Sequence, residues 1–127
     1  MKKILLLLFI VNTLLFGGLV EPENGVNLRY VHILFEWDQE PDAVSYNLQA
    51  SNQQSFNNLI LNIDELTTVY LDTESFNWDS TYYWRVKAVY SDGSSGVWSE
   101  VSYFNINDSI LTNLDVDIYN ADLVGDG

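Results

Sequence analysis

Residues Ser80–Tyr90 read STYYWRVKAVY, and their side chains alternate between two faces of an extended chain. Every second position holds an aromatic or apolar residue, and these are Tyr82, Trp84, Val86, Ala88 and Tyr90. A two-residue period rich in aromatic and β-branched side chains predicts a strand with one buried face. Because the large rings of Tyr82 and Trp84 need a thick apolar layer opposite them, we expect a central strand of a two-layer structure.

Segments on both sides of this strand alternate in the same way. In residues 31–38 and 44–51 the inward positions are expected to be Ile33, Phe35, Trp37, Val44, Tyr46, Leu48 and Ala50. Shorter strands are expected within residues 21–30, 56–63, 67–71 and 98–106, and the inward face of the run LIL at 59–61 stays open. Turn signals separate the segments, and no window repeats with the helical period. The sequence therefore predicts an all-β, seven-stranded antiparallel sandwich of the immunoglobulin-like type.

The N-terminal residues 1–20, MKKILLLLFIVNTLLFGGLV, have the pattern of a secretory signal peptide. Two lysines precede a long apolar run, and Gly17 and Gly18 supply small residues near a cleavage point. Leu15 and Phe16 are bulky where small residues are preferred, so an uncleaved anchor is the alternative. The run is shorter than the ~20 apolar residues that span a bilayer. We expect a secreted or extracytoplasmic protein, at the cell surface or in the periplasm, without stable membrane insertion after the leader is cleaved.

The charge of the chain restricts its partners. It contains 18 acidic and 5 basic residues, and loss of the two leader lysines takes the net charge from −13 to about −15. Such a surface repels phosphate backbones and anionic membranes, so no nucleic-acid partner is expected. The absence of cysteine excludes disulfides, thiolate metal sites and cysteine catalysis. His32 is the only histidine, and no nucleophile motif is present, so we predict no catalytic residue and no enzyme activity.

Several spaced motifs share the pattern of a known family. Trp37 stands on the expected second strand, and residues 43–51, AVSYNLQAS, place Tyr46 on the third. The spacing Phe76-x-Trp78-x-Ser80-x-Tyr82 follows, and the expected strand at residues 80–90 leads through a glycine-rich turn to Trp98-Ser99. Over residues 22–106 this set resembles the fibronectin type III family, especially its bacterial members, whose Leu-x-Pro-x-Thr-x-Tyr motif has proline where Trp78 stands. The resemblance implies a β-sandwich in which the Tyr82 hydroxyl bonds to backbone upstream of its strand.

The aromatic residues divide into an expected core and an expected surface. The structural core should contain Trp37, Tyr46, Phe76, Tyr82, Trp84 and Phe104, and Phe56 should close one end of it. The candidates for a ligand surface are Trp78, Tyr83, Arg85, Lys87 and Trp98. For these outward residues two interpretations stay open. They stack on one another as cation–π pairs, or they form an aromatic platform for a glycan or another polymer.

The acidic residues offer one further interpretation. Glu36, Asp38, Glu40 and Asp42 form a cluster that we interpret as a solvated face, with a calcium site as the alternative. Residues 107–127 form an acidic tail or linker, whose end, DLVGDG, is similar to a calcium loop but has Val124 at a ligand position. The tail is also similar to the segment entering the propeller of bacterial aryl-sulfate sulfotransferases. We expect no cofactor, with calcium as the one ion that the acids could bind.

These observations predict a non-catalytic exported module that acts as a spacer or as a protein or glycan interaction domain at the cell exterior. Two alternatives stay open. The chain is the N-terminal accessory domain of a truncated secreted enzyme of the aryl-sulfate sulfotransferase type, or it is a fragment of a calcium-binding adhesin.

Overall fold

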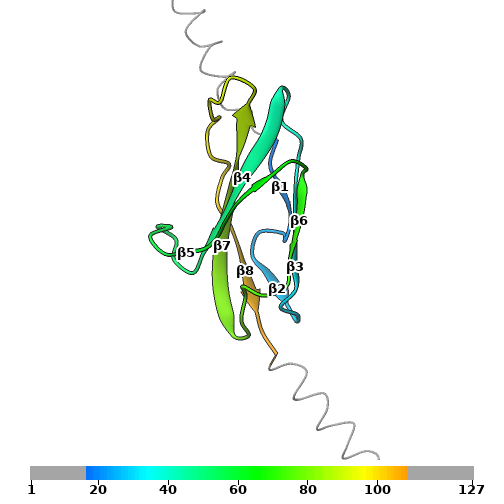
Figure 1. Ribbon diagram of the computed structural model, residues 1–127. Coiled ribbons are helices and arrows are strands. Elements are labelled where there is room, and N and C mark those ends of the chain that lie inside the picture. The colour runs from blue at the N-terminus through cyan, green and yellow to red at the C-terminus, as the bar shows by residue number, and fades with distance from the viewer. Residues whose placement is uncertain (1–16, 109–127) are drawn as a thin grey trace, which may run out of the picture.

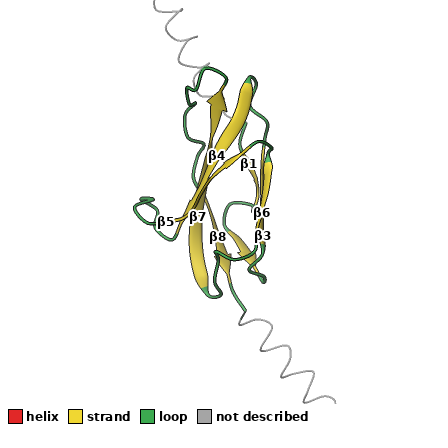
Figure 2. Ribbon diagram, viewed as in Figure 1, coloured by secondary structure: helices red, strands yellow, loops and turns green. Residues whose placement is uncertain are grey.

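The computed structural model describes residues 17–108, which form two packed β-sheets (Figures 1 and 2). One sheet has the strand order β1 (Leu19–Glu21), β3 (Ile33–Trp37), β6 (Val69–Asp72). The other has the order β2 (Val26–Leu28), β8 (Ser102–Ile106), β7 (Ser80–Tyr90), β4 (Ala43–Ser51), β5 (Leu59–Glu65). Nowhere in residues 17–108 is there a helix long and apolar enough to cross a membrane.

Strand β7 lies in the middle of the five-stranded sheet, where it pairs antiparallel with β4 on one side and with β8 on the other. Its bounds are those expected from the alternation of its sequence. The side chains of Tyr82, Trp84, Val86 and Ala88 are buried against the second sheet, while those of the intervening residues are half-buried on the outside. The expected two-layer all-β architecture is therefore confirmed.

Residues 17–108 contain eight strands, whereas the sequence predicted seven. The additional strand is β1, most of which lies before the segment 21–30 that was expected to hold the first strand. It pairs antiparallel with β3, whereas β2, inside that segment, pairs parallel with β8. Pro22 has no backbone donor, and Gly25, at a φ of 82°, turns the chain toward the second sheet. The Gly25 amide donates to the Tyr103 carbonyl at 2.7 Å. The parallel β2–β8 pair also means that the sandwich is not antiparallel throughout.

The sandwich begins earlier than Pro22, the start expected from the sequence. Strand β1 includes Leu19 and Val20, which the sequence pattern assigned to the leader, and Leu19 packs against the core. The Asp38 amide donates to the Gly18 carbonyl at 2.9 Å. A side chain at Gly17 would place its Cβ 2.6 Å from the Asp38 Cβ. In the sequence the apolar run of the expected leader continues into the first strand, so the pattern did not mark where the sandwich begins. Residues 1–16 of the expected leader and residues 109–127 of the expected tail lie outside the described part.

The core is built around Phe35, whose ring on the three-stranded sheet contacts side chains of the five-stranded sheet and of the loop before β7. Its centroid lies 5.0 Å from that of Trp84, 5.7 Å from that of Phe76 and 6.1 Å from that of Phe104. All six residues expected in the core are buried, namely Trp37, Tyr46, Phe76, Tyr82, Trp84 and Phe104. The buried indole N–H groups of Trp37 and Trp84 have no oxygen or nitrogen acceptor within the described residues. Each indole instead lies edge-to-face with a neighbouring ring, at 68° to Tyr46 and to Phe35 respectively.

Two hydroxyl groups hold the backbone at the ends of the sandwich. The Tyr82 hydroxyl accepts a hydrogen bond from the Asn77 amide at 3.0 Å, which is the bond to upstream backbone that the family resemblance implied. The Tyr46 hydroxyl accepts one from the Glu40 amide at 2.9 Å. Each bond satisfies a hydroxyl that burial of its ring would otherwise leave unpaired.

Four details of side-chain placement and strand bounds differ from those expected. Val44 is 51% exposed because a register shift between Ala43 and Ser45 turns its side chain outward, and a second shift at the end of β4 buries Ser51. Phe56 is buried outside the core cluster, in the loop before β5. The last strand begins at Ser102, so Trp98 precedes it.

Candidate functional site

The surface of the five-stranded sheet turned away from the core, here called the outer face, carries polar and aromatic side chains in rows. One row, across β7, β8 and β2, is Thr81, Asn105 and Asn27. The next contains Tyr83 beside Tyr103. The third, across β7, β4 and β5, is Arg85, Gln49 and Asn62, and the fourth is Lys87, Asn47 and Asp64. Amides therefore lie on both sides of a tyrosine pair on an extended sheet surface.

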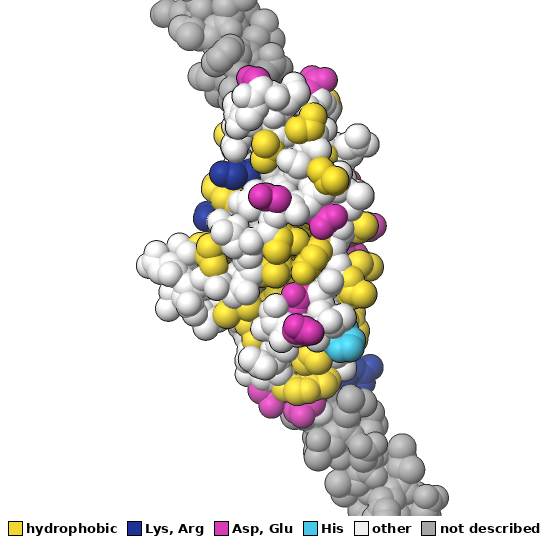
Figure 3. Space-filling model, viewed as in Figure 1, with side chains coloured by type: hydrophobic (Ala, Val, Ile, Leu, Met, Phe, Trp, Pro, Cys, Tyr) yellow, Lys and Arg dark blue, Asp and Glu magenta, His cyan; other side chains and the backbone are white. Residues whose placement is uncertain are grey.

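The guanidinium of Arg85 lies between two aromatic rings. Its Cζ is 4.1 Å from the ring centroid of Phe56 and 4.1 Å from that of Trp98, and the Lys87 Nζ is 4.7 Å from the Trp98 ring. The Nε and Nη2 groups of Arg85 both donate to Gln49 Oε1, at 3.1 and 2.9 Å. We call Phe56, Arg85, Trp98 and Lys87 the cation stack. Figure 3 shows two basic side chains together beside hydrophobic ones, above the protruding β4–β5 loop.

Local backbone features fix the two rings of the cation stack. Phe56 adopts a φ of 59°, and the loop before β5 is tied down by Ser51, whose hydroxyl donates to the Asn58 carbonyl at 2.6 Å. Trp98 is held by its neighbour Ser99. The Ser99 amide donates to the Val86 carbonyl at 2.8 Å, and the Val86 amide donates to the Ser99 hydroxyl at 3.0 Å. These bonds continue the sheet pairing of β7 beyond the start of β8.

Among the described residues the cation stack carries positive charge without a carboxylate partner. Burial lowers the pKa of Arg85 from its ordinary value, which is so high that the guanidinium remains charged at neutral pH. Within residues 17–108 neither Arg85 nor Lys87 makes an ion pair. Asp64, which lies in the same row as Lys87 with Asn47 between them, accepts a hydrogen bond from Asn47 at 3.3 Å.

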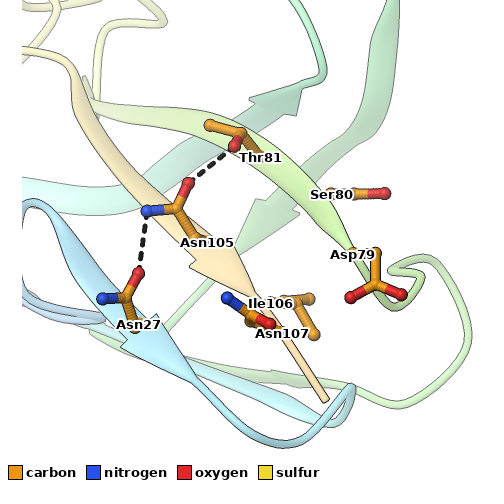
Figure 4. Close-up of a pocket in the computed structure, with 7 residues that line it drawn as sticks. All are labelled: Asn27, Asp79, Ser80, Thr81, Asn105, Ile106 and Asn107. Carbon is orange, nitrogen blue, oxygen red and sulfur yellow. Dashed lines mark hydrogen bonds between the residues drawn. The ribbon is translucent and has the colours of Figure 1, made fainter. Parts of the chain in front are cut away.

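A polar pocket of about 350 Å³ lies at the end of the outer face where β7 begins (Figure 4). Along one side of it, the Thr81 hydroxyl donates to Asn105 Oδ1 at 2.6 Å, and Asn105 Nδ2 donates to Asn27 Oδ1 at 3.0 Å. Asp79 and Ser80 line the other side, as Figure 4 shows. Hydrogen bonds between side chains hold this row of amides in one arrangement.

Comparison with solved structures identifies the architecture. An Fn3-like protein from Clostridium thermocellum superposes with a TM-score of 0.55 and 24% sequence identity, over 70% of this chain and 88% of that one. A fibronectin type III domain of human fibronectin type III domain containing protein 3 superposes with a TM-score of 0.53 and 20% identity, over 73% and 85% of the two chains. The fold is that of a fibronectin type III domain.

A sandwich similar to this one also occurs inside a large enzyme. The β-1,2-glucanase of Parabacteroides distasonis matches 72% of this chain with a TM-score of 0.53 and 18% identity, and the match spans 12% of the glucanase. No family model matches the sequence, and no curated protein is similar to it. At these identities the solved structures show the fibronectin type III-like fold alone.

Four of the five ligand candidates meet on the outer face of the fibronectin type III-like sandwich, and Trp78 does not. Tyr83, Arg85 and Lys87 project from β7, and Trp98 contacts the last two. Trp78 is 43% exposed in the turn before β7. Seven residues of strand separate Ser80 from Lys87, roughly 23 Å at the usual rise per residue, so Trp78 lies at the far end of the sheet.

Sequence reasoning missed three contributors to the outer face. Phe56 was expected at one end of the core, yet its ring lies on Arg85. Gln49 and Tyr103 received no role, although both alternate outward on strands next to β7. Their outward alternation was the signal available in the sequence. The order of the strands, which decides what lies beside what, was absent from it.

The acidic cluster does not form a compact site. No three acidic or histidine side chains in residues 17–108 gather closely enough to hold a metal ion. The Glu40 and Asp38 amides are used in hydrogen bonds to Tyr46 and Gly18 that hold the fold together. The calcium-like sequence DLVGDG lies outside the described residues.

Proposed function

We propose that this chain is a non-catalytic, exported binding module that holds a glycan on the outer face of its five-stranded sheet. The observation that carries the proposal is the arrangement of the outer face. Tyr83 and Tyr103 lie side by side, with ring centroids 6.3 Å apart, between a row that ends in Asn27 and a row that contains Gln49. Sugar rings offer flat C–H faces that stack on aromatic rings and hydroxyl groups that bond to side-chain amides.

The remaining titratable groups favour a binding role over catalysis. Burial, followed by nearby carboxylates, raises the pKa of Tyr70 and of Tyr90, and hydrogen bonds from Ser94 lower the pKa of Asp92. They are scattered over the sandwich and do not converge on a pocket with a nucleophile and a base. Export is part of the proposal because residues 1–20 have the pattern of a signal peptide.

A glycan array tests the proposal. The full chain is expected to bind at least one glycan class, and the double variant Tyr83→Ala/Tyr103→Ala is expected to lose that binding. Tyr30→Ala is the matched control, because Tyr30 is an exposed tyrosine that lies outside the outer face. Circular dichroism verifies that all three proteins are folded. If the wild-type chain binds no glycan on the array, or if the double variant binds as well as the wild type, a glycan-binding outer face is refuted.

A second candidate, an accessory domain of a secreted enzyme, is favoured by the glucanase that contains a similar sandwich. Reading the gene past the codon for Gly127 separates the two. A long catalytic domain in the same frame supports the accessory role, and a stop codon supports the free module. The calcium-binding adhesin alternative predicts a thermal midpoint that rises in millimolar calcium, and equal midpoints in calcium and chelator would remove it.

A further inference from the structure

Within residues 17–108 the two cations of the cation stack have aromatic and amide partners and no acidic one. Among residues 17–108 the basic side chains are Arg29, Arg85 and Lys87, and two of the three are neighbours on one face of β7. A chain with 18 acidic residues has many carboxylates to offer. The structure nevertheless gives Arg85 a neutral amide oxygen, that of Gln49, and two aromatic rings.

From this arrangement we infer that the cation stack binds an anionic polysaccharide through its carboxylate or sulfate groups, by short-range hydrogen bonds at a point where salt screens the repulsion from the more distant acids of the chain. The inference rests on the proposed glycan-binding function and names the charge of the ligand. The ring centroids of Phe56 and Trp98 each lie 4.1 Å from the Arg85 guanidinium carbon, so we expect an incoming group to approach the guanidinium at its free edge. Gln49 accepts from Nε and Nη2, which leaves the Nη1 hydrogens directed away from these partners.

The chemistry of the two cations suits a planar or multidentate anion. The guanidinium edge presents donors in a fixed fork that matches carboxylate and sulfate oxygens. Lys87 stands two residues further on the same face of β7, about 7 Å along the strand, and contributes an ammonium with three donors. The flanking rings exclude water on two sides, and a charge-assisted hydrogen bond is stronger in such surroundings.

The position of the cation stack favours a polysaccharide over an acidic peptide. Arg85 and Gln49 stand on β7 and β4, and the sheet order places both strands in the interior of the sheet. Their backbone groups are already paired, so a peptide cannot add there as an extra strand. Recognition has to use side chains alone, and the neighbouring tyrosine pair and amide rows continue along the surface beside the stack.

Polymers that differ only in charge test the inference. The full chain is titrated with polygalacturonate and with its fully methyl-esterified form, and in parallel with dextran sulfate and dextran. We expect binding to at least one of the charged polymers and about tenfold weaker binding to its neutral parent, the effect of one charge-assisted hydrogen bond. Polygalacturonate binding identifies carboxylate as the preferred group, and dextran sulfate binding identifies sulfate.

Variants assign the binding to the stack. Lys87→Gln keeps most of the side-chain stem and is expected to weaken binding of the charged polymer about tenfold. Arg29→Gln removes the same charge from an exposed position after β2 and is expected to leave binding unchanged. An equal loss of polymer binding in both variants would show general electrostatic attraction to the protein, and would refute specific binding at the cation stack.

The other outcomes separate this inference from the proposed function. Equal binding of charged and neutral polymers, or binding on the glycan array confined to neutral sugars, would overturn the inference and leave the glycan-binding function standing. Binding of poly-glutamate as tight as that of the charged polysaccharides would overturn the polysaccharide assignment. No binding to any polymer or array glycan would overturn both.

Discussion

Replacing Tyr82 by phenylalanine removes a single oxygen atom from the sandwich and tests the bond that closes the corner before β7. The Tyr82 side chain is 3% exposed, and its hydroxyl accepts from the Asn77 amide at 3.0 Å. Its ring packs edge-on against Phe76, with centroids 4.8 Å apart and an interplanar angle of 84°. The variant keeps this ring contact and deletes the hydrogen bond.

The expected loss follows from the exposure of the donor. An amide that remains buried without an acceptor costs up to about 3 kcal/mol, whereas a net hydrogen bond contributes about 1 kcal/mol. Asn77 is an exposed residue, so its amide can turn to water in the variant. We therefore expect a loss near 1 kcal/mol, which lowers the thermal midpoint of a domain of this size by about 4–8 °C. Tyr82→Ala also removes the ring and is expected to cost about 3–5 kcal/mol.

The assay is thermal and urea unfolding followed by tryptophan fluorescence, which reports on the buried indoles of Trp37 and Trp84. Tyr30→Phe is the control, because Tyr30 is 54% exposed and loses no core contact. Two results would refute the reasoning. In one, Tyr82→Phe is as stable as Tyr30→Phe, so the corner bond contributes nothing. In the other, it is as unstable as Tyr82→Ala, so the hydroxyl and not the ring holds the corner.

Four further changes have defined expected outcomes. Trp37→Ala should cost about 3–5 kcal/mol and prevent stable folding, and an unchanged thermal midpoint would show that this ring is dispensable. Gly18→Ala should lower the thermal midpoint, because φ is 126° at this position and residues with a side chain avoid this region. Equal stability of the variant and the wild-type chain in urea would contradict the role of Gly18 in holding β1. Burial, together with the carboxylates of Glu40 and Asp42, raises the pKa of Tyr90, so folding favours its neutral form. Stability should then be complete below pH about 10 and fall as the pH rises through the raised pKa, and Tyr90→Phe should reduce this alkaline loss. Because acids far outnumber bases, raising NaCl from about 0.02 M to about 0.5 M should screen their repulsion and raise the midpoint, whereas a falling midpoint would show that attractive charge pairs dominate.

The sequence predicted the strands best where a strict two-residue period is tied to one buried face. Strand β7 has the bounds expected for it, because any slip would carry Trp84 into water. The prediction was wrong at Val44, because the register shift at the start of β4 is a backbone feature that the pattern of side chains does not record. It was also wrong at the start of the sandwich, where the apolar residues of the leader and of β1 form one run.

The candidate surface was predicted in part for a related reason. Alternation along β7 placed Tyr83, Arg85 and Lys87 together on the outer face without knowledge of the other strands. The partners of Arg85 come from elsewhere in the chain, since Gln49 lies 36 residues before it and Phe56 sits in a loop with a left-handed backbone. Contacts of this kind depend on strand order and loop path, which a single sequence does not encode locally.

The attachment of β1 to β3 would have a consequence for the expected cleavage of the N-terminal leader. A peptidase cut after residue 20 would discard Leu19 and Val20, and β3 would lose the antiparallel neighbour that pairs with Trp37 and Glu36. The uncovered backbone donors and acceptors of β3 would then be able to pair with a strand of a second molecule. The cleaved product would therefore tend to aggregate. A cut before Leu19 would keep β1 and avoid this outcome. The position of the cleaved peptide bond would therefore decide whether the mature chain stays soluble.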